Sequence, residues 1–151
     1  FCNLAVEAEM AIKVDADAKI TSVFPIIELH NFVFRAPNKT LSELIANNGL
    51  NRGLVTSAEI WQKPPDFYEK KLALSLEING SEIGSGELWS MEGGPASSLH
   101  WLQNHLADHD LTLLQGNIIL GGTALGLHKV RAGDRIDVKL DGEKAVHCSI
   151  N

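Results

Sequence analysis

LALSLEINGSEIGSGEL, residues 72–88, carries the pattern that decides the fold, because it joins two alternating runs through one defined turn. Every second residue of 72–78 is leucine or isoleucine, as expected of a strand with one buried face. Asn79 and Gly80 then provide the positive φ angles of a type I′ turn, and residues 81–88 return beside the first run. The sequence therefore predicts a β-hairpin.

Further strands are predicted near the N-terminus. Apolar residues occupy every second position of residues 4–14, and residues 20–34 are rich in Val, Ile and Phe, which favours one strand or two. The polar residues 15–19 between them are short enough for a turn. Pro25 has no N–H to give to a neighbouring strand, so it indicates an edge or a bend.

Local signals predict two helices and another strand. Thr40, followed three residues later by Glu43, is typical of a capping box, and it predicts a short helix that residues 47–49 would end. Residues 54–61 favour a strand. Leucines at helical spacing predict one amphipathic helix over residues 95–109.

The rest of the chain indicates short strands separated by glycine-containing turns. We expect a β-rich α+β fold with one domain over residues 1–151, because no repeat or long linker interrupts the pattern. The short strands are predicted at residues 117–120, 129–130, 135–140 and 145–150.

Composition narrows the class of protein. The 151 residues are 44% hydrophobic and 21% charged, which is ordinary for a globular protein. A net charge of −6 and the lack of a basic cluster argue against nucleic-acid binding, and the apolar runs are too short to cross a membrane. Cys2 and Cys148 lie near opposite ends, which favours free thiols over a disulfide. We favour a cytoplasmic location for the protein, and a leader peptide upstream of Phe1 is an open alternative.

Three acidic residues are candidate metal ligands. Glu7 and Glu9 are two positions apart, so both carboxylates project from one face of a strand. Glu28 lies in an apolar run, where a buried carboxylate needs a compensating charge. Three carboxylates with open water positions suit Mg²⁺ or Mn²⁺. On spacing alone, an exposed acidic strand face without any ion is the more common arrangement.

Three motifs add a family resemblance. VEAEMA (6–11), FPIIE (24–28) and IANNG (45–49) resemble, in order, the metal motif, the third-ligand motif and an active-site stretch of the 2-hydroxypentadienoate hydratase and fumarylacetoacetate hydrolase family. The resemblance extends from residue 6 to the C-terminus. Further segments that resemble the family's closing hairpin, helix and barrel strands are residues 84–86, 93–95, 99–102, 117–122 and 132–135.

The resemblance implies a mixed, barrel-like fold of the fumarylacetoacetate hydrolase C-terminal type, with one or two short helices. It implies Mg²⁺ or Mn²⁺ as cofactor, a small 2-oxo or 2-hydroxydienoate acid as partner, and metal-dependent lyase or hydrolase activity in bacterial aromatic catabolism. Asn48 would lie beside the substrate as a catalytic residue, with Gly122 and Thr123 also binding the substrate. The implied metal ligands are Glu7, Glu9 and Glu28.

His30 is a further candidate, because it shares the strand face of Glu28 and could carry a proton or support the metal; ordinary packing is its alternative. His105 and His109 are four residues apart on the predicted helix, where surface or packing roles are favoured over a metal site.

Departures from the family's pattern leave a second hypothesis open. Asn47 stands where the family has Asp, Gly121 stands where it has Thr, and a lysine that family members carry upstream of the first motif has no counterpart here. We therefore expect an N-terminally truncated relative. It is either a metal-dependent enzyme or a catalytically inactive small-acid binding or accessory protein. Apolar surface left uncovered would favour a homodimer or another homo-oligomer.

Overall fold

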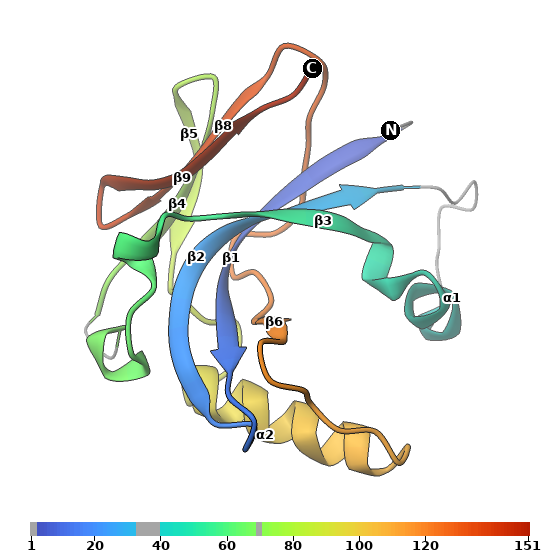
Figure 1. Ribbon diagram of the computed structural model, residues 1–151. Helices are drawn as coiled ribbons and strands as arrows, with labels where there is room; N and C mark the ends of the chain where they lie inside the picture. Colours follow the sequence, from blue (N-terminus) through green and yellow to red (C-terminus); the bar gives the residue numbers. More distant parts are fainter. Residues whose placement is uncertain (1–2, 33–39, 69–70) are drawn as a thin grey trace.

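The computed structural model describes residues 3–32, 40–68 and 71–151, which fold into two curled antiparallel sheets with helices at their edges (Figure 1). The strands are β1 (Leu4–Val14), β2 (Ile20–Asn31), β3 (Asn51–Thr56), β4 (Leu74–Ile78), β5 (Ser81–Gly86), β6 (Ile118–Leu120), β7 (His128–Lys129), β8 (Arg135–Leu140) and β9 (Glu143–Ser149). The helices are α1 (Leu41–Ala46) and α2 (Gly94–Ala107), with 3₁₀ turns η1 (Asn48–Leu50), η2 (Glu59–Trp61) and η3 (Pro65–Tyr68).

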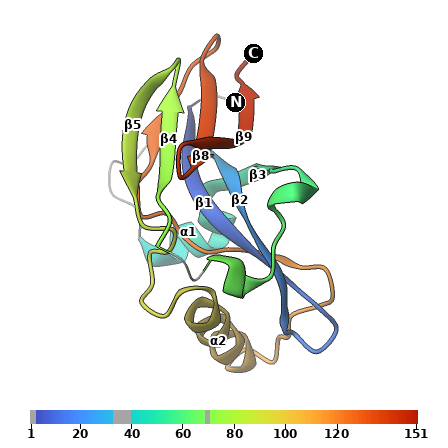
Figure 2. The same ribbon diagram turned by 90° about the vertical axis from the view of Figure 1, so that its left-hand side faces the viewer.

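The larger sheet has the strand order β3-β2-β1-β6, with β7 also paired to β1, and the smaller sheet has the order β5-β4-β8-β9. The larger sheet curls into a half-barrel, and α2 lies at one end of it (Figures 1 and 2). Gln103 of α2 fixes this position by donating a hydrogen bond to the backbone of Ala18, in the turn between β1 and β2. The expected β-rich α+β fold is confirmed.

The core lies between the two sheets. One face of β1 contributes Val6, Ala8, Met10, Ile12 and Val14, all fully or almost fully buried. They belong to one cluster with apolar side chains of the smaller sheet, where each buried Val, Leu or Ile stabilises the fold by about 1.5–3 kcal/mol. The contributing side chains of that sheet include Leu74, Leu76, Ile136, Val138 and Val146. Because this face of β1 packs in the core, a functional site on β1 would have to lie on its opposite face.

The structure confirms the predicted hairpin. β4 and β5 pair in antiparallel fashion, and Asn79 and Gly80 have φ angles of 55° and 80°, as a type I′ turn requires. The capping box is also confirmed, since the Thr40 side chain accepts from the Glu43 amide and the Glu43 side chain accepts from the Thr40 amide. The amphipathic helix is confirmed as α2.

The strand predicted over residues 54–61 is wrong in its second half. β3 ends at Thr56, paired with Ile26, and the next position on β2 is Pro25. Val23 donates a backbone hydrogen bond to Lys63 and accepts one from it. Because every second residue of a strand presents its backbone groups to the same edge, Pro25 faces that edge as well. Since proline has no N–H, β3 cannot continue past Thr56, and the chain turns into η2 instead. Pro25 thus lies in a curved strand, beyond the end of its neighbour.

Two sequence expectations lie outside the described residues. They concern Cys2 and the end of the strand predicted over residues 20–34. Cys148 is a free thiol. Among the described residues, the helices are too short or too polar to cross a membrane.

Candidate metal centre

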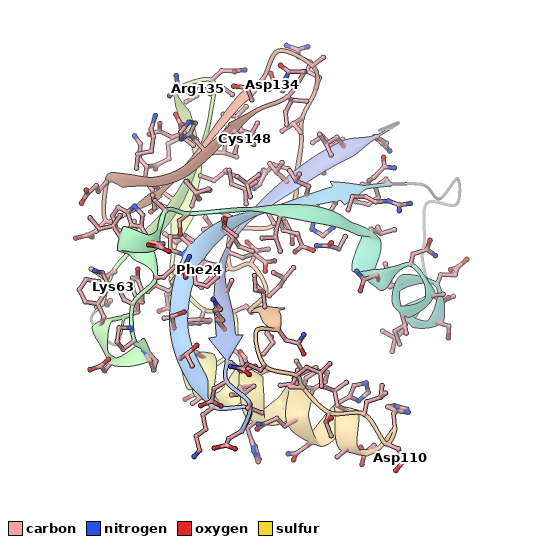
Figure 3. The ribbon with its side chains drawn as sticks, in the orientation of Figure 1. Phe24, Lys63, Asp110, Asp134, Arg135 and Cys148 are labelled. Atoms are coloured by element: carbon pink, nitrogen blue, oxygen red, sulfur yellow. The ribbon has the colours of Figure 1, made fainter. Side chains whose placement is uncertain are left out.

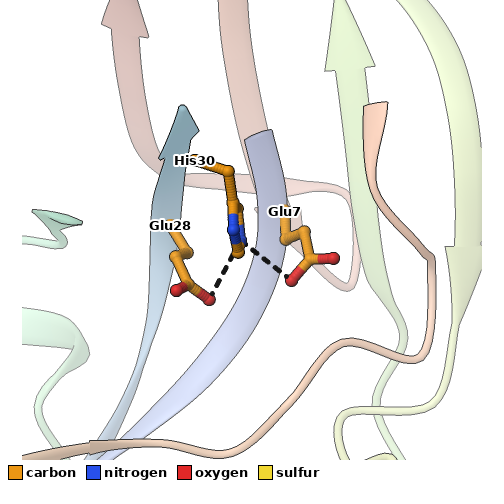
Figure 4. A group of neighbouring side chains, drawn as sticks. All are labelled: Glu7, Glu28 and His30. Atoms are coloured by element: carbon orange, nitrogen blue, oxygen red, sulfur yellow. Dashed lines mark hydrogen bonds and ion pairs between the residues drawn. The ribbon is translucent and has the colours of Figure 1, made fainter. Parts of the chain in front are cut away.

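The candidate site lies on the face of β1 and β2 that points away from the core between the sheets. Glu7 and Glu28 are direct cross-strand partners, and Ala5 is the partner of His30. Because strand side chains alternate between faces, Glu7 and Glu9 emerge on the same side, beside Glu28 and His30 of β2. Figure 4 shows the imidazole of His30 between the carboxylates of Glu7 and Glu28.

His30 joins the two carboxylates through one atom. Its Nε2 lies 3.2 Å from Glu7 Oε2 and 3.3 Å from Glu28 Oε2. The side chains of His30 and Glu28 are each 8% exposed, whereas that of Glu7 is 16% exposed, so Glu7 is the side of the cluster most open to solvent. One ligand atom from each of the three residues lies within 4.8 Å of the others, a spacing that could hold a metal ion.

Two further contacts fix the acidic side chains. Asn51, at the start of β3, donates from Nδ2 to Glu28 Oε1 at 2.7 Å. The backbone N–H of Gly122, just after β6, donates to Glu9 Oε2 at 3.1 Å. Gly122 has a φ of 80°, which favours glycine, and this turn aims the amide at the carboxylate. Strands on both sides of β1 and β2 therefore position the site.

The electrostatics show that the cluster is crowded with negative charge. Burial raises the pKa of Glu9 to about 9, with the charge of Glu28 and contacts with Glu7 adding to the effect. Burial opposes ionisation of Glu28 as well, but hydrogen bonds from His30 and Asn51 outweigh it and lower the pKa of Glu28. Burial disfavours the charged form of His30, yet hydrogen bonds and charges from Glu28 and Glu7 raise its pKa to about 10. The site thus favours a positive charge.

The donor set fits a divalent cation. Carboxylate oxygens are the ligands that Mg²⁺ and Mn²⁺ prefer. Oxygens of Glu7 and Glu28 come together here with His30, and Glu9 contacts both acids. Glu9 is only 2% exposed and Glu28 6% exposed, so their negative charges cannot be stabilised by bulk water alone. The residues that could hold such an ion are Glu7, Glu9 and Glu28, with His30 beside them.

The other predicted site residues, Asn48, Gly122 and Thr123, lie outside the group of acidic side chains. Asn48 is exposed at the start of η1, and among the described residues no hydrogen bond links its side chain to the cluster. Gly122 touches the cluster through Glu9. Thr123 Oγ1 donates to the backbone of Ala8 at 2.9 Å and accepts from the amide of Leu125, so its hydroxyl also holds the loop against β1. Their catalytic and substrate-binding roles stay predictions.

Asn51 is the residue that sequence reasoning missed. It contacts Glu28 directly, yet the strand that carries it was predicted to begin three residues later. The available signal was Gly49, whose positive φ breaks the helical path just before the strand begins. Gly49 has a φ of 64° and Asn51 is already extended.

Comparison with known proteins identifies the family. Residues 3–150 match the family model described as fumarylacetoacetate (FAA) hydrolase, C-terminal. The chain belongs to this family. One similar protein is the 2-oxo-hept-4-ene-1,7-dioate hydratase of Escherichia coli. It is 28% identical over 133 residues, which cover 83% of this chain and 49% of the relative. The chain thus spans about half the length of that relative.

Solved structures agree on the fold. The 4-oxalocrotonate decarboxylase from Pseudomonas putida G7, complexed with magnesium and adipate, superposes with a TM-score of 0.86 at 21% identity, covering 99% of this chain and 61% of that one. The fumarylpyruvate hydrolase from Pseudomonas aeruginosa, in complex with Mn²⁺ and pyruvate, gives a TM-score of 0.65 at 14% identity, covering 99% and 67%. At these identities the match establishes the fumarylacetoacetate hydrolase fold alone.

Proposed function

We propose that this chain binds Mg²⁺ or Mn²⁺ through Glu7, Glu9 and Glu28 and uses the ion to bind a small 2-oxo or 2-hydroxydienoate acid. The observation that carries the proposal is the convergence of three carboxylates from β1 and β2, two of them almost sealed from water. Oxygen donors at such a place suit these cations, and a cation would offset the buried negative charge. Two neighbours of similar fold were solved with such ions and small acids.

The chain's own residues divide the remaining work. A bound divalent cation would attract the carboxylate and adjacent oxygen of the acid and stabilise negative charge that develops there. The Gly122 amide and the Asn51 side chain hold Glu9 and Glu28 in orientation. Glu7, the most exposed of the three acids, marks the side from which a small acid would approach.

The relatives support a class of reaction. The matching proteins are named as hydratases, decarboxylases and hydrolases of small oxo acids. We propose a hydratase-like lyase or a hydrolase as the activity, with His30 lying beside the bound acid. His30 is the described nitrogen base nearest to both Glu7 and Glu28.

A second candidate function is that of a small-acid binding or accessory protein without turnover. It is favoured by the position of Asn48, which was expected beside the substrate but is exposed and, within the described residues, makes no hydrogen bond to the cluster. Such a protein would keep the metal and the acid but lack a complete set of reacting groups.

Thermal stability tests the metal. Because a ligand that binds only the folded state stabilises it by mass action, Mg²⁺ or Mn²⁺ should raise the unfolding temperature, and oxalate or pyruvate should raise it further. Glu9→Gln should abolish both increases, whereas Glu82→Gln, an exposed acid on β5, should keep them. Equal increases in both variants, or none in the wild type, would contradict the proposed site.

Turnover separates the two functions. The purified chain with Mn²⁺ would be given 2-hydroxypentadienoate-like acids, and loss of the conjugated diene absorbance would be followed with time. Consumption that is lost in Glu9→Gln supports the enzyme. Binding of pyruvate or oxalate without consumption of any such acid supports the accessory protein.

A further inference from the structure

We infer that His30 is itself a metal ligand, so that this centre combines oxygen donors with one imidazole nitrogen and prefers transition metals over Mg²⁺. This inference deepens the proposed function and rests on it. Its basis is the grouping of Glu7, Glu28 and His30 as the residues whose ligand atoms lie mutually close.

The distances agree with a shared cation. Ligand atoms about 2.1 Å from an ion lie roughly 3.0 Å apart at right angles and roughly 3.4 Å apart in a tetrahedron. The Nε2 atom of His30 lies 3.2 Å and 3.3 Å from the carboxylate oxygens of Glu7 and Glu28. All three ligand atoms lie within 4.8 Å of one another, so modest side-chain movements would place them around one ion.

Strand pairing fixes the relative positions of the three side chains. Glu7 and Glu28 are directly opposed on paired strands, and His30 follows Glu28 by two residues on the same face. All three side chains lie on the central strands of the larger sheet. Glu9 is held differently, because one of its oxygens already accepts from the Gly122 amide. Glu9 retains its other oxygen for the ion, which would give four protein ligands and leave two positions for a chelating acid.

A nitrogen ligand changes which metal the centre selects. Carboxylate and water ligands suit Mg²⁺, whereas imidazole favours Mn²⁺, Co²⁺ and Zn²⁺ in increasing measure. The side chain of His30 is only 8% exposed, so the surrounding residues hold it in place. We expect Co²⁺ to bind at least about tenfold more tightly than Mg²⁺, beyond what the acids alone provide.

His30→Gln is the matched variant. Glutamine places an amide near the position of Nε2, so it can still donate hydrogen bonds to both carboxylates, but it has no imidazole nitrogen to give to a metal. If His30 is a ligand, the ratio of the Mg²⁺ to the Co²⁺ dissociation constant should fall about tenfold or more in this variant. If His30 only bridges the acids by hydrogen bonds, the ratio should not change.

Surface histidines need a control, because His105 on α2 and His109 just after it are exposed, have ring centroids 5.0 Å apart and could bind transition metals. All titrations are therefore made in a His105→Gln, His109→Gln background. Calorimetry then compares Mg²⁺, Mn²⁺ and Co²⁺ on this background with and without His30→Gln.

A spectroscopic readout avoids dependence on how well the variant folds. Pulsed electron paramagnetic resonance of bound Mn²⁺ should show coupling to a directly bound ¹⁴N nucleus, and the pattern should change when the histidines carry ¹⁵N. Metal binding without nitrogen coupling, or with an unchanged Mg²⁺/Co²⁺ ratio in His30→Gln, overturns the role of His30 and leaves the metal site standing. No binding of any of the three metals overturns the proposed function itself, and this inference with it.

Discussion

Gly121 shows how closely the segment after β6, which carries Gly122, packs against β1. Its amide donates to the backbone oxygen of Met10 at 2.9 Å. A Cβ atom at this position would lie 2.7 Å from that same oxygen and 2.9 Å from the ring of Trp89. The threonine that the family resemblance led us to expect here has no room, because the indole of Trp89 occupies the space. This departure from the family pattern therefore has a packing cause.

Gly121→Ala is expected to destabilise the fold by about 1–3 kcal/mol, because neither a backbone oxygen nor a packed indole can move aside cheaply. Urea unfolding followed by tryptophan fluorescence measures the change in free energy. Gly84→Ala is the control, since nothing lies within 4 Å of a Cβ there. If the two variants were equally stable, the close contact at Gly121 would have no energetic consequence.

For single residues, the sequence was sufficient to predict which acids share a strand face, but not which residues contact them. Alternation along residues 4–14 placed Glu7 and Glu9 on one face, because the period of a strand is two. The contacts of Glu9 with Gly122 and of Glu28 with Asn51 depend on which segments pair, because the partners are 113 and 23 positions apart in the sequence. No local pattern contains that information.

Among the elements, the β8–β9 hairpin of the smaller sheet holds a second charged group. Asp137 of β8 accepts from Lys144 Nζ at 2.9 Å and lies 3.4 Å from Arg135 Nε. Arg135 and Cys148 mark this hairpin in Figure 3. Burial alone would raise the pKa of Asp137, but the Lys144 and Arg135 contacts outweigh it and lower this pKa. Burial and the charge of Asp137 raise the pKa of the Cys148 thiol.

Acid should therefore weaken this hairpin. A carboxyl group with a lowered folded-state pKa stabilises the fold above its unfolded pKa of 3.8, and this contribution is lost as the pH falls through the lower folded value. Asp137→Asn should cost about 1–2 kcal/mol near pH 7 and progressively less below about pH 4. Urea unfolding between pH 3 and 7 measures the difference, with the exposed Glu143→Gln as control. A penalty that did not shrink in acid would contradict the charged interaction.

Local sequence patterns predicted some helices and strands correctly and missed the end of one strand. The hairpin over residues 72–88 and the capping box at Thr40 depend on residues next to one another, and both are confirmed. The strand predicted over residues 54–61 looked equally apolar, but its length was set by Pro25 on the neighbouring strand. The end of a strand depends on its partner as much as on its own residues, which is why this boundary was wrong.

For the whole molecule, apolar side chains left on the surface bear on assembly. Leu111 and Leu114, on the segment between α2 and β6, are 56% and 66% exposed, and Ile118, the first residue of β6, is 40% exposed. We term these three residues the α2–β6 apolar group. Clusters of this kind on a folded surface mark interaction sites, because burying each such side chain is worth about 1.5–3 kcal/mol. A second copy of the chain, related by a two-fold axis, would bring the same group of each copy together.

We therefore expect a homodimer with the α2–β6 apolar group at its interface. Sedimentation equilibrium should give twice the 16.4 kDa of one chain, and Leu111→Glu with Leu114→Glu should shift the mass toward 16.4 kDa, since two charges per copy would have to be buried in the interface. Ile60→Glu is the matched control, because Ile60 is 70% exposed on η2, outside the group. Far-ultraviolet circular dichroism would establish that each variant is folded. A wild type that sediments as a monomer at every concentration rules out the dimer, and a dimer that persists in the double variant moves its interface to another face.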